Sequence, residues 1–382
     1  MGADETGRRP GPGMTRGEYW LRIGALLALL SVFLLAVDLL GDGIAQLGSD
    51  FTDELFRGLD NPVVGLSVGI LATVLAQSSS VTTATVVGLV GAGLIPLEQA
   101  VPVIMGANIG TTITNTLASL GSIRRPEEFR RAFAGATVHD VFNLLAVALL
   151  LPIELLTGVL SRTAIWLSGP LSDATTGEIR SPVKNAVDAA ADTVTGAVTF
   201  VAGDGLAGGT VLIVLALGAI FATLFSITRT MRAVMAGPAE RWLNRILGGV
   251  GVVGIVVGAL LTVAVQSSSI TTALLIPMLA AGVLSLRAAY PVTLGANIGT
   301  TITALLAALA VDLATGLEIA LVHLLFNLAG ILLLYGLPFL RDLPVTIALR
   351  IADLAVAHRS QLIAYVLVLF YLAPLLGIIL LR

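Results

Sequence analysis

The 382-residue sequence contains no cysteine, only three histidines and a single lysine, Lys184. The absence of cysteine excludes disulfides, thiolate metal sites, iron–sulfur clusters and cysteine nucleophiles. The histidines His139, His323 and His358 lie too far apart to form a recognisable metal motif, so no cofactor is expected. Any ligand must therefore be bound by oxygen and amide groups.

Charge is also scarce, at 12% of residues, with 21 basic and 24 acidic side chains. No basic stripe could neutralise a phosphate backbone, which excludes a nucleic-acid partner. Soluble domains carry roughly 25% charged residues, whereas this chain is 56% hydrophobic with a mean hydropathy of +0.97. The composition predicts an all-α polytopic membrane protein.

Seven apolar runs are long enough to cross a bilayer as helices at about 1.5 Å per residue. The first follows a polar tail with Arg8, Arg9 and Arg16 and has no small-residue cleavage site, which indicates an uncleaved signal anchor. The predicted crossings are 20–40, 101–120, 132–152, 206–228, 288–310, 317–337 and 361–381.

Two further apolar runs, 62–94 and 248–284, contain no charged residue but are interrupted by the same polar cluster, Gln-Ser-Ser-Ser, at 77–80 and 266–269. Four adjacent polar side chains at membrane depth require protein or a wet cavity around them. Each run is therefore predicted to be a re-entrant helical hairpin that turns at the cluster, with two very short crossings as the alternative.

Arginines dominate three loops, 124–131, 229–245 and 341–359, whereas 41–61 is acidic. The protein is expected in the cell (inner) membrane. The positive-inside rule places those loops and the N-terminus in the cytoplasm and the acidic segment outside. The polar stretch 168–200 is expected to be a poorly ordered external linker between the two halves.

An internal repeat relates the two interrupted runs. Residues 77–115 align with 266–304 without a gap at an offset of 189, with 22 identities in 39 positions. The shared motifs are Gln-Ser-Ser-Ser-x-Thr-Thr-Ala and Gly-Ala-Asn-Ile-Gly-Thr-Thr-Ile-Thr, and a His-x-x-Phe-Asn motif recurs at 139–143 and 323–327. Three predicted crossings between the two clusters invert the second copy, as in secondary transporters that work by alternating access.

The resulting organisation has five parts, of which the two repeats carry the function. They are 1–60, the tail, anchor helix and external segment; 61–167, repeat 1; 168–200, the linker; 201–340, repeat 2; and 341–382, an amphipathic segment and a final helix.

The polar clusters suit two kinds of ligand. Hydroxyl, amide and backbone oxygens are hard ligands for a cation such as sodium, whereas hydroxyl and amide donors at a helix N-terminus suit an anion. The glycines beside Asn108 and Asn297 permit a break in the adjacent span or a close backbone approach. Lone residues such as Thr73, Thr85 and Thr262 are instead expected at helix interfaces.

Asp140 lies eight residues into an apolar run, where a carboxylate is costly without a partner or a bound cation. His139 and His323 are equally consistent with an interhelical hydrogen bond and with a site role.

These motifs, together with the Phe-Arg-Arg-Ala-Phe-Ala-Gly-Ala-Thr-Val-His-Asp segment at 129–140, closely resemble the type II sodium-dependent phosphate cotransporters over roughly residues 61–338. The chain looks like a compact prokaryotic member. Where animal members have a Gly-Asp pair before this segment, the chain reads Ile123-Arg124-Arg125, so no role of that acid carries over.

The resemblance implies sodium-coupled, electrogenic symport of inorganic phosphate and no enzyme activity. The expected partners are phosphate, sodium ions and the lipid bilayer, with a homodimer as a further option. The residues assigned to phosphate are Gln77, Ser78, Ser79, Ser80, Asn108, Gln266, Ser267, Ser268, Ser269 and Asn297. Those assigned to sodium are Gln77, Thr111, Asp140, Asn143, Gln266, Ser268, Thr300 and Thr303. The supporting residues are Thr82, Thr83, Thr271, Thr272, His139, His323 and Asn327.

Three alternatives stay open on the residues alone, of which a passive channel is disfavoured by the absence of a continuous polar stripe. The solute could be another oxyanion, such as arsenate or sulfate, because all would use the same donors. An intramembrane serine hydrolase using Ser78 or Ser267 with a histidine base is disfavoured, since no Gly-x-Ser-x-Gly elbow is present and catalysis would not need two copies.

Overall fold

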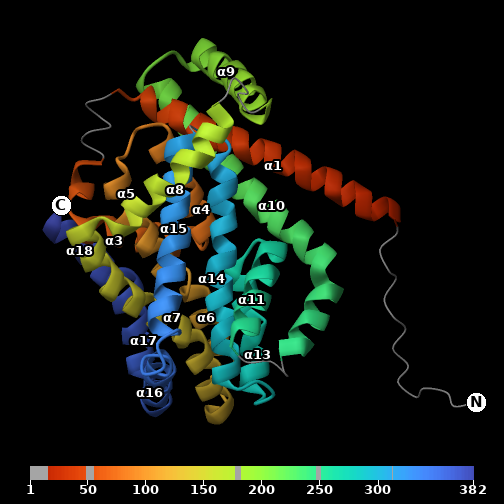
Figure 1. Cartoon of the computed structure of the whole chain (residues 1–382), viewed down its shortest axis with the longest axis vertical. Helices are drawn as coiled ribbons and strands as arrows, with labels where there is room; N and C mark the ends of the chain where they lie inside the picture. Colours follow the sequence, from red (N-terminus) through yellow and green to blue (C-terminus); the bar gives the residue numbers. More distant parts are fainter. Residues whose placement is uncertain (1–15, 49–55, 177–181, 247–250, 312) are drawn as a thin grey trace, which may run out of the picture.

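The computed structural model describes residues 16–48, 56–176, 182–246, 251–311 and 313–382. The regular structure in these residues is helical throughout (Figure 1), which confirms the predicted all-α class. The N-terminal tail with Arg8 and Arg9 lies outside the described residues.

Six helices among the described residues are long and apolar enough to cross a membrane, and each overlaps a predicted crossing. They span 20–45, 126–157, 206–230, 286–308, 314–334 and 359–381. The corresponding elements are α1 (Arg16–Ala45), α7 (Pro126–Thr157), α10 (Leu206–Ile246), α14 (Leu286–Ala308), α15 (Leu313–Leu334) and the C-terminal run from α17 (Arg359–Leu367) through a π-turn, η3 (Val368–Leu372), to α18 (Ala373–Leu381).

The seventh predicted crossing, 101–120, is not one helix. The chain forms α5 (Leu97–Gly110) and then α6 (Ile113–Ser119), with a break at Thr111 and Thr112, followed by the short 3-10 helix η2 (Leu120–Ser122). Its counterpart in the second repeat, α14, continues without interruption. The flanking glycines therefore accompany a break in the first copy only.

Each interrupted apolar run forms short helices on either side of a tight turn at the Gln-Ser-Ser-Ser cluster, two in the first copy and three in the second. In the first copy α3 (Pro62–Ala76) follows the 3-10 helix η1 (Arg57–Asp60) and leads into α4 (Ser79–Gly91). In the second, α11 (Val252–Val265) leads into α12 (Ser268–Ala273) and α13 (Leu275–Ala280). None of these helices is long enough for an ordinary span.

Glycines allow close backbone contact where α5 crosses α3 and where α14 crosses α11. A Cβ on Gly106 in α5 would overlap the backbone of Leu66 in α3, and a Cβ on Gly295 in α14 would overlap the backbone of Ile255 in α11. Both glycines belong to the Gly-Ala-Asn-Ile-Gly motifs. The predicted close approach is therefore present in both copies.

The stretch 168–200 is not a poorly ordered linker where it is described. Helix α8 (Val159–Thr176) runs into it, and α9 (Pro182–Ala202) crosses the end of the bundle beside α1 (Figure 1). Val187 and Ala191 recur at helical spacing and are buried, and the Thr195 hydroxyl donates to Asp42 of α1 at 3.0 Å. The apolar stripe and this bond fix the segment; residues 177–181 lie outside the described part.

The arginine-rich stretch 229–245 is likewise helical, because α10 continues to Ile246. After α15 the amphipathic helix α16 (Leu343–Ala357) packs on α7. There Arg130 donates hydrogen bonds to both carboxylate oxygens of Asp353, which lowers the pKa of that exposed carboxyl.

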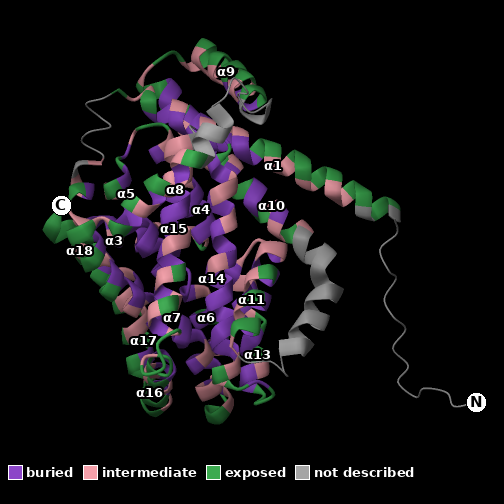
Figure 2. Cartoon of the chain, viewed as in Figure 1, coloured by how far each residue is buried: buried purple, intermediate pink, exposed green. Residues whose placement is uncertain are grey.

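Burial is concentrated where the two repeats meet. Helices α4, α5 and α14 are largely buried and α7 and α15 about half buried, whereas the N-terminal half of α1 leaves the bundle and exposes large apolar side chains such as Trp20 and Leu21 (Figure 2). Apolar exposure of this kind is what a lipid environment accommodates. The interior, by contrast, contains many buried threonine, serine and asparagine residues.

Candidate functional site

The two turns have the same backbone conformation. Gln77 (φ 52°, ψ 26°) and Gln266 (φ 55°, ψ 32°) are the only residues other than glycine with positive φ among those described. The left-handed conformation costs a side-chain-bearing residue about 1 kcal/mol or more, so the surrounding contacts must hold it. Two independent copies of a strained glutamine indicate that both side chains are needed at the turn.

Hydrogen bonds within the turns also match at the 189-residue offset. Ser78 Oγ accepts from the Val81 amide at 3.3 Å, and Ser267 Oγ accepts from the Ile270 amide at the same distance. These serines are N-caps of α4 and α12. Each helix therefore begins at the second serine of its cluster.

Two threonine pairs brace the turns. Thr73 Oγ1 donates to Thr82 Oγ1 at 3.0 Å across the first copy, and Thr262 Oγ1 donates to Thr271 Oγ1 at 2.8 Å across the second. All four side chains are buried. Thr82 and Thr271 thus support the turns, and Thr73 and Thr262, expected only at helix interfaces, are their partners.

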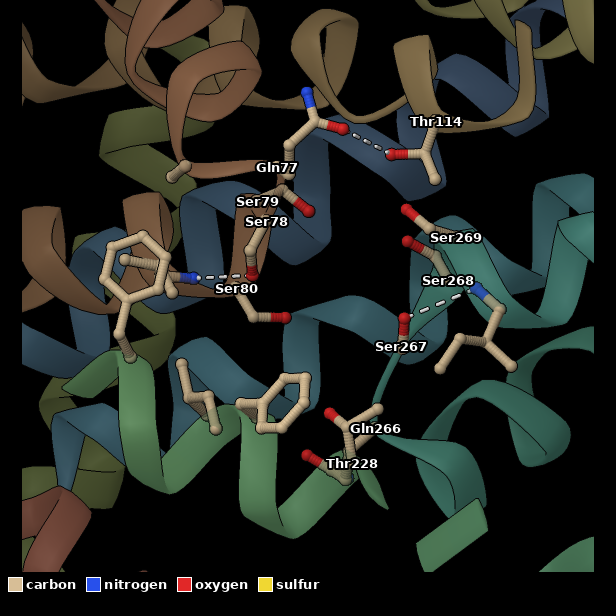
Figure 3. A pocket seen from close by; sticks show the side chains of 16 residues that line it. Gln77, Ser78, Ser79, Ser80, Thr114, Thr228, Gln266, Ser267, Ser268 and Ser269 are labelled. Carbon is tan, nitrogen blue, oxygen red and sulfur yellow. Dashed lines mark hydrogen bonds between the residues drawn. The ribbon is translucent and has the colours of Figure 1, made fainter. Parts of the chain in front are cut away.

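The two clusters line one cavity of about 320 Å³. Figure 3 shows the serines of the first turn facing those of the second across it. The polar lining consists of Gln77, Ser78, Ser79, Ser80, Thr114, Thr228, Gln266, Ser267, Ser268 and Ser269. Helix α10 closes one wall with Phe221, Leu224 and Phe225. Eight of the ten residues predicted to bind phosphate therefore gather at one place.

The electrostatics of this cavity favour an anion. The first-turn amides of a helix have no intrahelical partner, and the helix dipole is positive at that end. Helix α4 begins at Ser79 and α12 begins at Ser268, so two such ends border the cavity. Among the described residues that line it there is no Lys, Arg, Asp or Glu. Neutral donors and helix ends are therefore the groups that this cavity offers.

Each turn glutamine also faces a threonine from the adjacent helix. Thr114 Oγ1 lies 3.4 Å from Gln77 Oε1, and Thr303 Oγ1 lies 3.4 Å from Gln266 Oε1. Each glutamine donates its Nε2 to a backbone carbonyl three residues back, at 2.6 and 2.7 Å. The glutamine oxygens are therefore oriented beside a hydroxyl, which is a pair of hard oxygen ligands. Thr303 was predicted from the sequence; its equivalent Thr114 was not.

The other predicted threonines bond within their own turns of helix. Thr111 donates to the Ala107 carbonyl at 2.9 Å, and Thr300 donates to the Ala296 carbonyl at 3.0 Å. Thr83 and Thr272 donate likewise to the carbonyls of Ser79 and Ser268, at 2.8 Å each. The hydroxyl of Thr272 also accepts from Asn115 Nδ2 at 2.6 Å, whereas those of Thr111, Thr300 and Thr83 keep their lone pairs for another contact.

Asn108 and Asn297 lie outside the cavity, in a buried network that joins the repeats. His139 Nε2 lies 2.6 Å from Asn297 Oδ1, and His323 Nε2 lies 3.4 Å from Asn108 Oδ1. Asn143 donates to the Asn108 carbonyl and accepts from Asn297 Nδ2, both at 2.8 Å. The sequence placed both asparagines with the phosphate ligands, but their side chains are engaged with the opposite repeat.

Asn327, the last supporting residue, donates to the His323 carbonyl at 2.9 Å and is fully buried. It therefore sits beside the same network. The histidines, engaged with asparagines, are not available as bases for Ser78 or Ser267, whose hydroxyls cap helices.

Asp140 is fully buried in α7, one residue after His139. Its Oδ2 accepts hydrogen bonds from the Tyr365 hydroxyl at 2.5 Å and the Thr116 hydroxyl at 3.5 Å. Its Oδ1 has no hydrogen-bond partner in the described part of the chain. A buried carboxylate with one unused oxygen has room for a cation, and the sodium role of Asp140 stays a prediction. Thr116 and Tyr365 were missed because no motif marks them.

Asp140 is not the only buried acid of the repeats. Glu154, near the end of α7, is 7% exposed and accepts from the amides of Leu160 and Ser161 at 2.6 and 3.1 Å. Its charge thus lies at the N-terminus of α8, where a carboxylate is favourable. Unlike Asp140, Glu154 has a full set of partners within the protein.

The fold and cavity define a polytopic helical membrane protein with a polar site between two related halves. A family model described as Na+/Pi-cotransporter matches residues 32–163 and 220–341. The rat protein "Sodium-dependent phosphate transport protein 2A" is 33% identical, with 97% of this chain and 70% of the relative covered. The human protein "Sodium-dependent phosphate transport protein 2B" is 32% identical, with 93% and 64% covered. No solved structure matches the chain.

The chain therefore belongs to the Na+/Pi-cotransporter family, as the motifs predicted. Both matched ranges include a Gln-Ser-Ser-Ser turn and a Gly-Ala-Asn-Ile-Gly motif. The members are transporters rather than enzymes, so the serine hydrolase alternative is rejected.

Proposed function

We propose that the chain is a secondary active transporter that couples sodium entry to uptake of inorganic phosphate by alternating access. The observation that carries the proposal is the meeting of two helix N-termini, one from each repeat, at a single polar cavity. A tetrahedral oxyanion is the ligand that such an arrangement accommodates, because unpaired amides and hydroxyls can surround it.

Phosphate binds in this account between the two turns. The serine hydroxyls and first-turn amides of α4 and α12 donate to its oxygens, and the described residues that line the cavity include no basic side chain to balance its charge. Its charge, between about one and two negative units near neutral pH, is then balanced by sodium rather than by the protein. Coupling follows, since neither ion binds well without the other.

Sodium occupies two related positions beside the turns. The Gln77 and Thr114 oxygens form one hard-oxygen pair, and the Gln266 and Thr303 oxygens form its counterpart. Thr111, Thr300 and Ser268 lie close by in sequence and contribute hydroxyl or carbonyl oxygens. Two sodium ions neutralise the divalent phosphate, so both can cross a low-dielectric interior with it.

A third sodium ion binds at Asp140 and makes transport electrogenic. Neutral hydroxyls hold a cation whose charge the substrate balances, whereas an additional cation needs a carboxylate. The unpartnered Asp140 Oδ1 provides it, and Leu324 stands at the equivalent position of the second repeat. The asymmetry assigns the additional charge to the first half of the chain.

The two turns are re-entrant hairpins in this proposal, and the second repeat is inverted relative to the first. Each helix of a hairpin is too short to span alone, and its polar turn needs a wet cavity. Inverted repeats with broken elements at the repeat interface permit the site to open alternately to either side. The N-terminus lies in the cytoplasm and the protein in the cell (inner) membrane; a homodimer stays a prediction.

The test is uptake of labelled phosphate into proteoliposomes under an inward sodium gradient, with potassium replacing sodium as the control. We expect accumulation that depends on sodium and that unlabelled phosphate abolishes. Labelled sulfate and arsenate are run in parallel. Sodium-driven sulfate uptake without phosphate uptake would replace the substrate, and equal uptake in potassium would reject the coupling.

A further inference from the structure

The two carboxylate oxygens of Asp140 differ in their hydrogen bonds. Oδ2 accepts from the Tyr365 hydroxyl at 2.5 Å and from Thr116 at 3.5 Å, while Oδ1 has no partner among the described residues. The Thr112 hydroxyl, at the break between α5 and α6, donates to the Ile109 carbonyl at 2.8 Å. One oxygen is thus fixed by donors and the other is left for a ligand.

Tyr365 comes from the C-terminal helix α17, outside both ranges that the family model matches. Its ring packs edge-on against Phe133 of α7, with centroids 6.2 Å apart, and against Phe370, at 6.3 Å. These contacts fix the ring independently of the hydroxyl. The direction in which the hydroxyl points is therefore set by packing, and the carboxylate is positioned to suit it.

The other donor to Asp140 belongs to a helix that is fixed elsewhere. Next to Thr116 in α6, Asn115 donates its Nδ2 to Thr272 Oγ1 of α12 at 2.6 Å. Helix α6 is thereby tied to the second turn and does not follow the carboxylate freely. Helix α17, by contrast, runs directly into the short π-helix η3. Such π-helical segments often occur at functional sites within α-helices. Tyr365 is the closer and better placed of the two donors.

We propose that Tyr365 is a positioning residue that holds the Asp140 carboxylate with Oδ1 free for the third sodium ion. The inference rests on the proposed function, in which Asp140 binds that ion. Groups that hydrogen-bond to a metal-binding carboxylate orient it and keep it charged, and removing them typically weakens metal binding 10- to 100-fold. The C-terminal helix therefore sets the sodium affinity of a site in the first repeat.

Tyr365→Phe tests this inference because it removes the hydroxyl and keeps the ring that packs on Phe133 and Phe370. We expect the sodium concentration for half-maximal phosphate uptake to rise about tenfold or more. The phosphate KM and the maximal rate at saturating sodium should stay within about twofold. Tyr371→Phe, six residues further along the same C-terminal run, is the matched control and should keep the wild-type sodium dependence.

A second measurement does not depend on transport. Sodium chloride, compared with choline chloride, should raise the thermal midpoint of the detergent-solubilised wild type, because a ligand that binds the folded state stabilises it. Tyr365→Phe should need about tenfold more sodium than the wild type for the same shift in thermal midpoint. In the Asp140→Asn background, proteins with Tyr365 and with Tyr365→Phe should need the same sodium concentration. Unchanged sodium dependence in Tyr365→Phe would overturn the inference. The inference would also fail if Tyr365→Phe raised the sodium requirement equally in the Asp140→Asn background, where no carboxylate is left to position.

These outcomes separate the inference from the function on which it rests. Sodium-stimulated phosphate uptake by the wild type supports the function whatever Tyr365→Phe does. A sodium-dependent thermal shift that Tyr365→Phe weakens supports the positioning role even if the transported anion proves not to be phosphate. A wild type that sodium neither drives nor stabilises rejects both.

Discussion

His139 Nε2 in α7 lies 2.6 Å from Asn297 Oδ1 in α14, so a histidine of the first repeat pairs with an asparagine of the second. The reciprocal pair, His323 and Asn108, is longer at 3.4 Å. All four side chains are buried. The crossed arrangement connects the two halves of the molecule through buried side chains.

The first prediction is that His139→Leu destabilises the protein by roughly 1–3 kcal/mol, because it leaves the buried Asn297 oxygen without a donor. His323→Leu should cost less, since its bond is longer. The thermal midpoint in detergent measures both, with His358→Leu, an exposed position, as the control. If His139→Leu abolishes uptake with an unchanged midpoint, His139 is a site residue rather than a connection.

These pairs show what the sequence could and could not predict. The two polar turns and the close approach of Gly106 follow from composition and spacing, and the structure has them, whereas the inverted relation of the repeats stays a prediction. Asn297 as the partner of His139 and Tyr365 as a partner of Asp140 do not follow, because these bonds join residues more than 150 positions apart and no local pattern records which helices meet. Thr116 is only 24 positions from Asp140, but no motif marks it.

The second prediction concerns the glycines of the crossing helices. Gly106→Ala and Gly295→Ala should each destabilise the protein by about 1–3 kcal/mol, because the new Cβ would overlap backbone of the crossing helix and the cores cannot expand freely. Gly218→Ala in α10 meets nothing within 4 Å and should be neutral or slightly stabilising. Equal midpoints for the three variants would contradict the close crossings.

The third prediction is that Asp140 carries the voltage dependence. Phosphate uptake into wild-type proteoliposomes should rise under an inside-negative potential, because a third sodium ion gives the transported complex a net positive charge. Asp140→Gly should transport without that response. The potential is set with a potassium gradient and valinomycin.

Glu154→Gln is the matched control, because it neutralises the other buried acid of α7, which lies at the N-terminus of α8. It should lower the thermal midpoint and keep the voltage response. A wild type that is insensitive to potential, or an Asp140→Gly variant with the full response, would make the acid a structural partner of Tyr365 and Thr116.

The fourth prediction tests orientation. The chain has no cysteine, so single cysteines can be introduced without background. Cysteine at the exposed position Asp204, between α9 and α10, should react with an impermeant external reagent in intact cells. Cysteine at Glu127, exposed at the start of α7, should react only after permeabilisation. The reverse pattern would overturn the arginine-based orientation.

The segment 168–200 shows a different limit of sequence reasoning. Its polar composition and acidic residues predicted a linker, but Val187 and Ala191 share one face of α9 and are buried. Polarity averaged over the segment hid an amphipathic helix, whose stripe is visible only at a period of 3.6 residues. The glycines beside Asn108 and Asn297 permitted a break in either copy, but the sequence could not show that it occurs only at Thr111, because the same motif continues as a helix in α14.

The central claim is that the two turns form one shared site. The most direct measurement is equilibrium binding of labelled phosphate to the purified protein in saturating sodium, with Gln77→Ala, Gln266→Ala and the exposed control Gln361→Ala. One phosphate should bind per chain, each turn variant should lose it, and the control should bind normally, because either glutamine alone leaves half of the site unformed. Two phosphates per chain, or normal binding by either turn variant, would contradict the account.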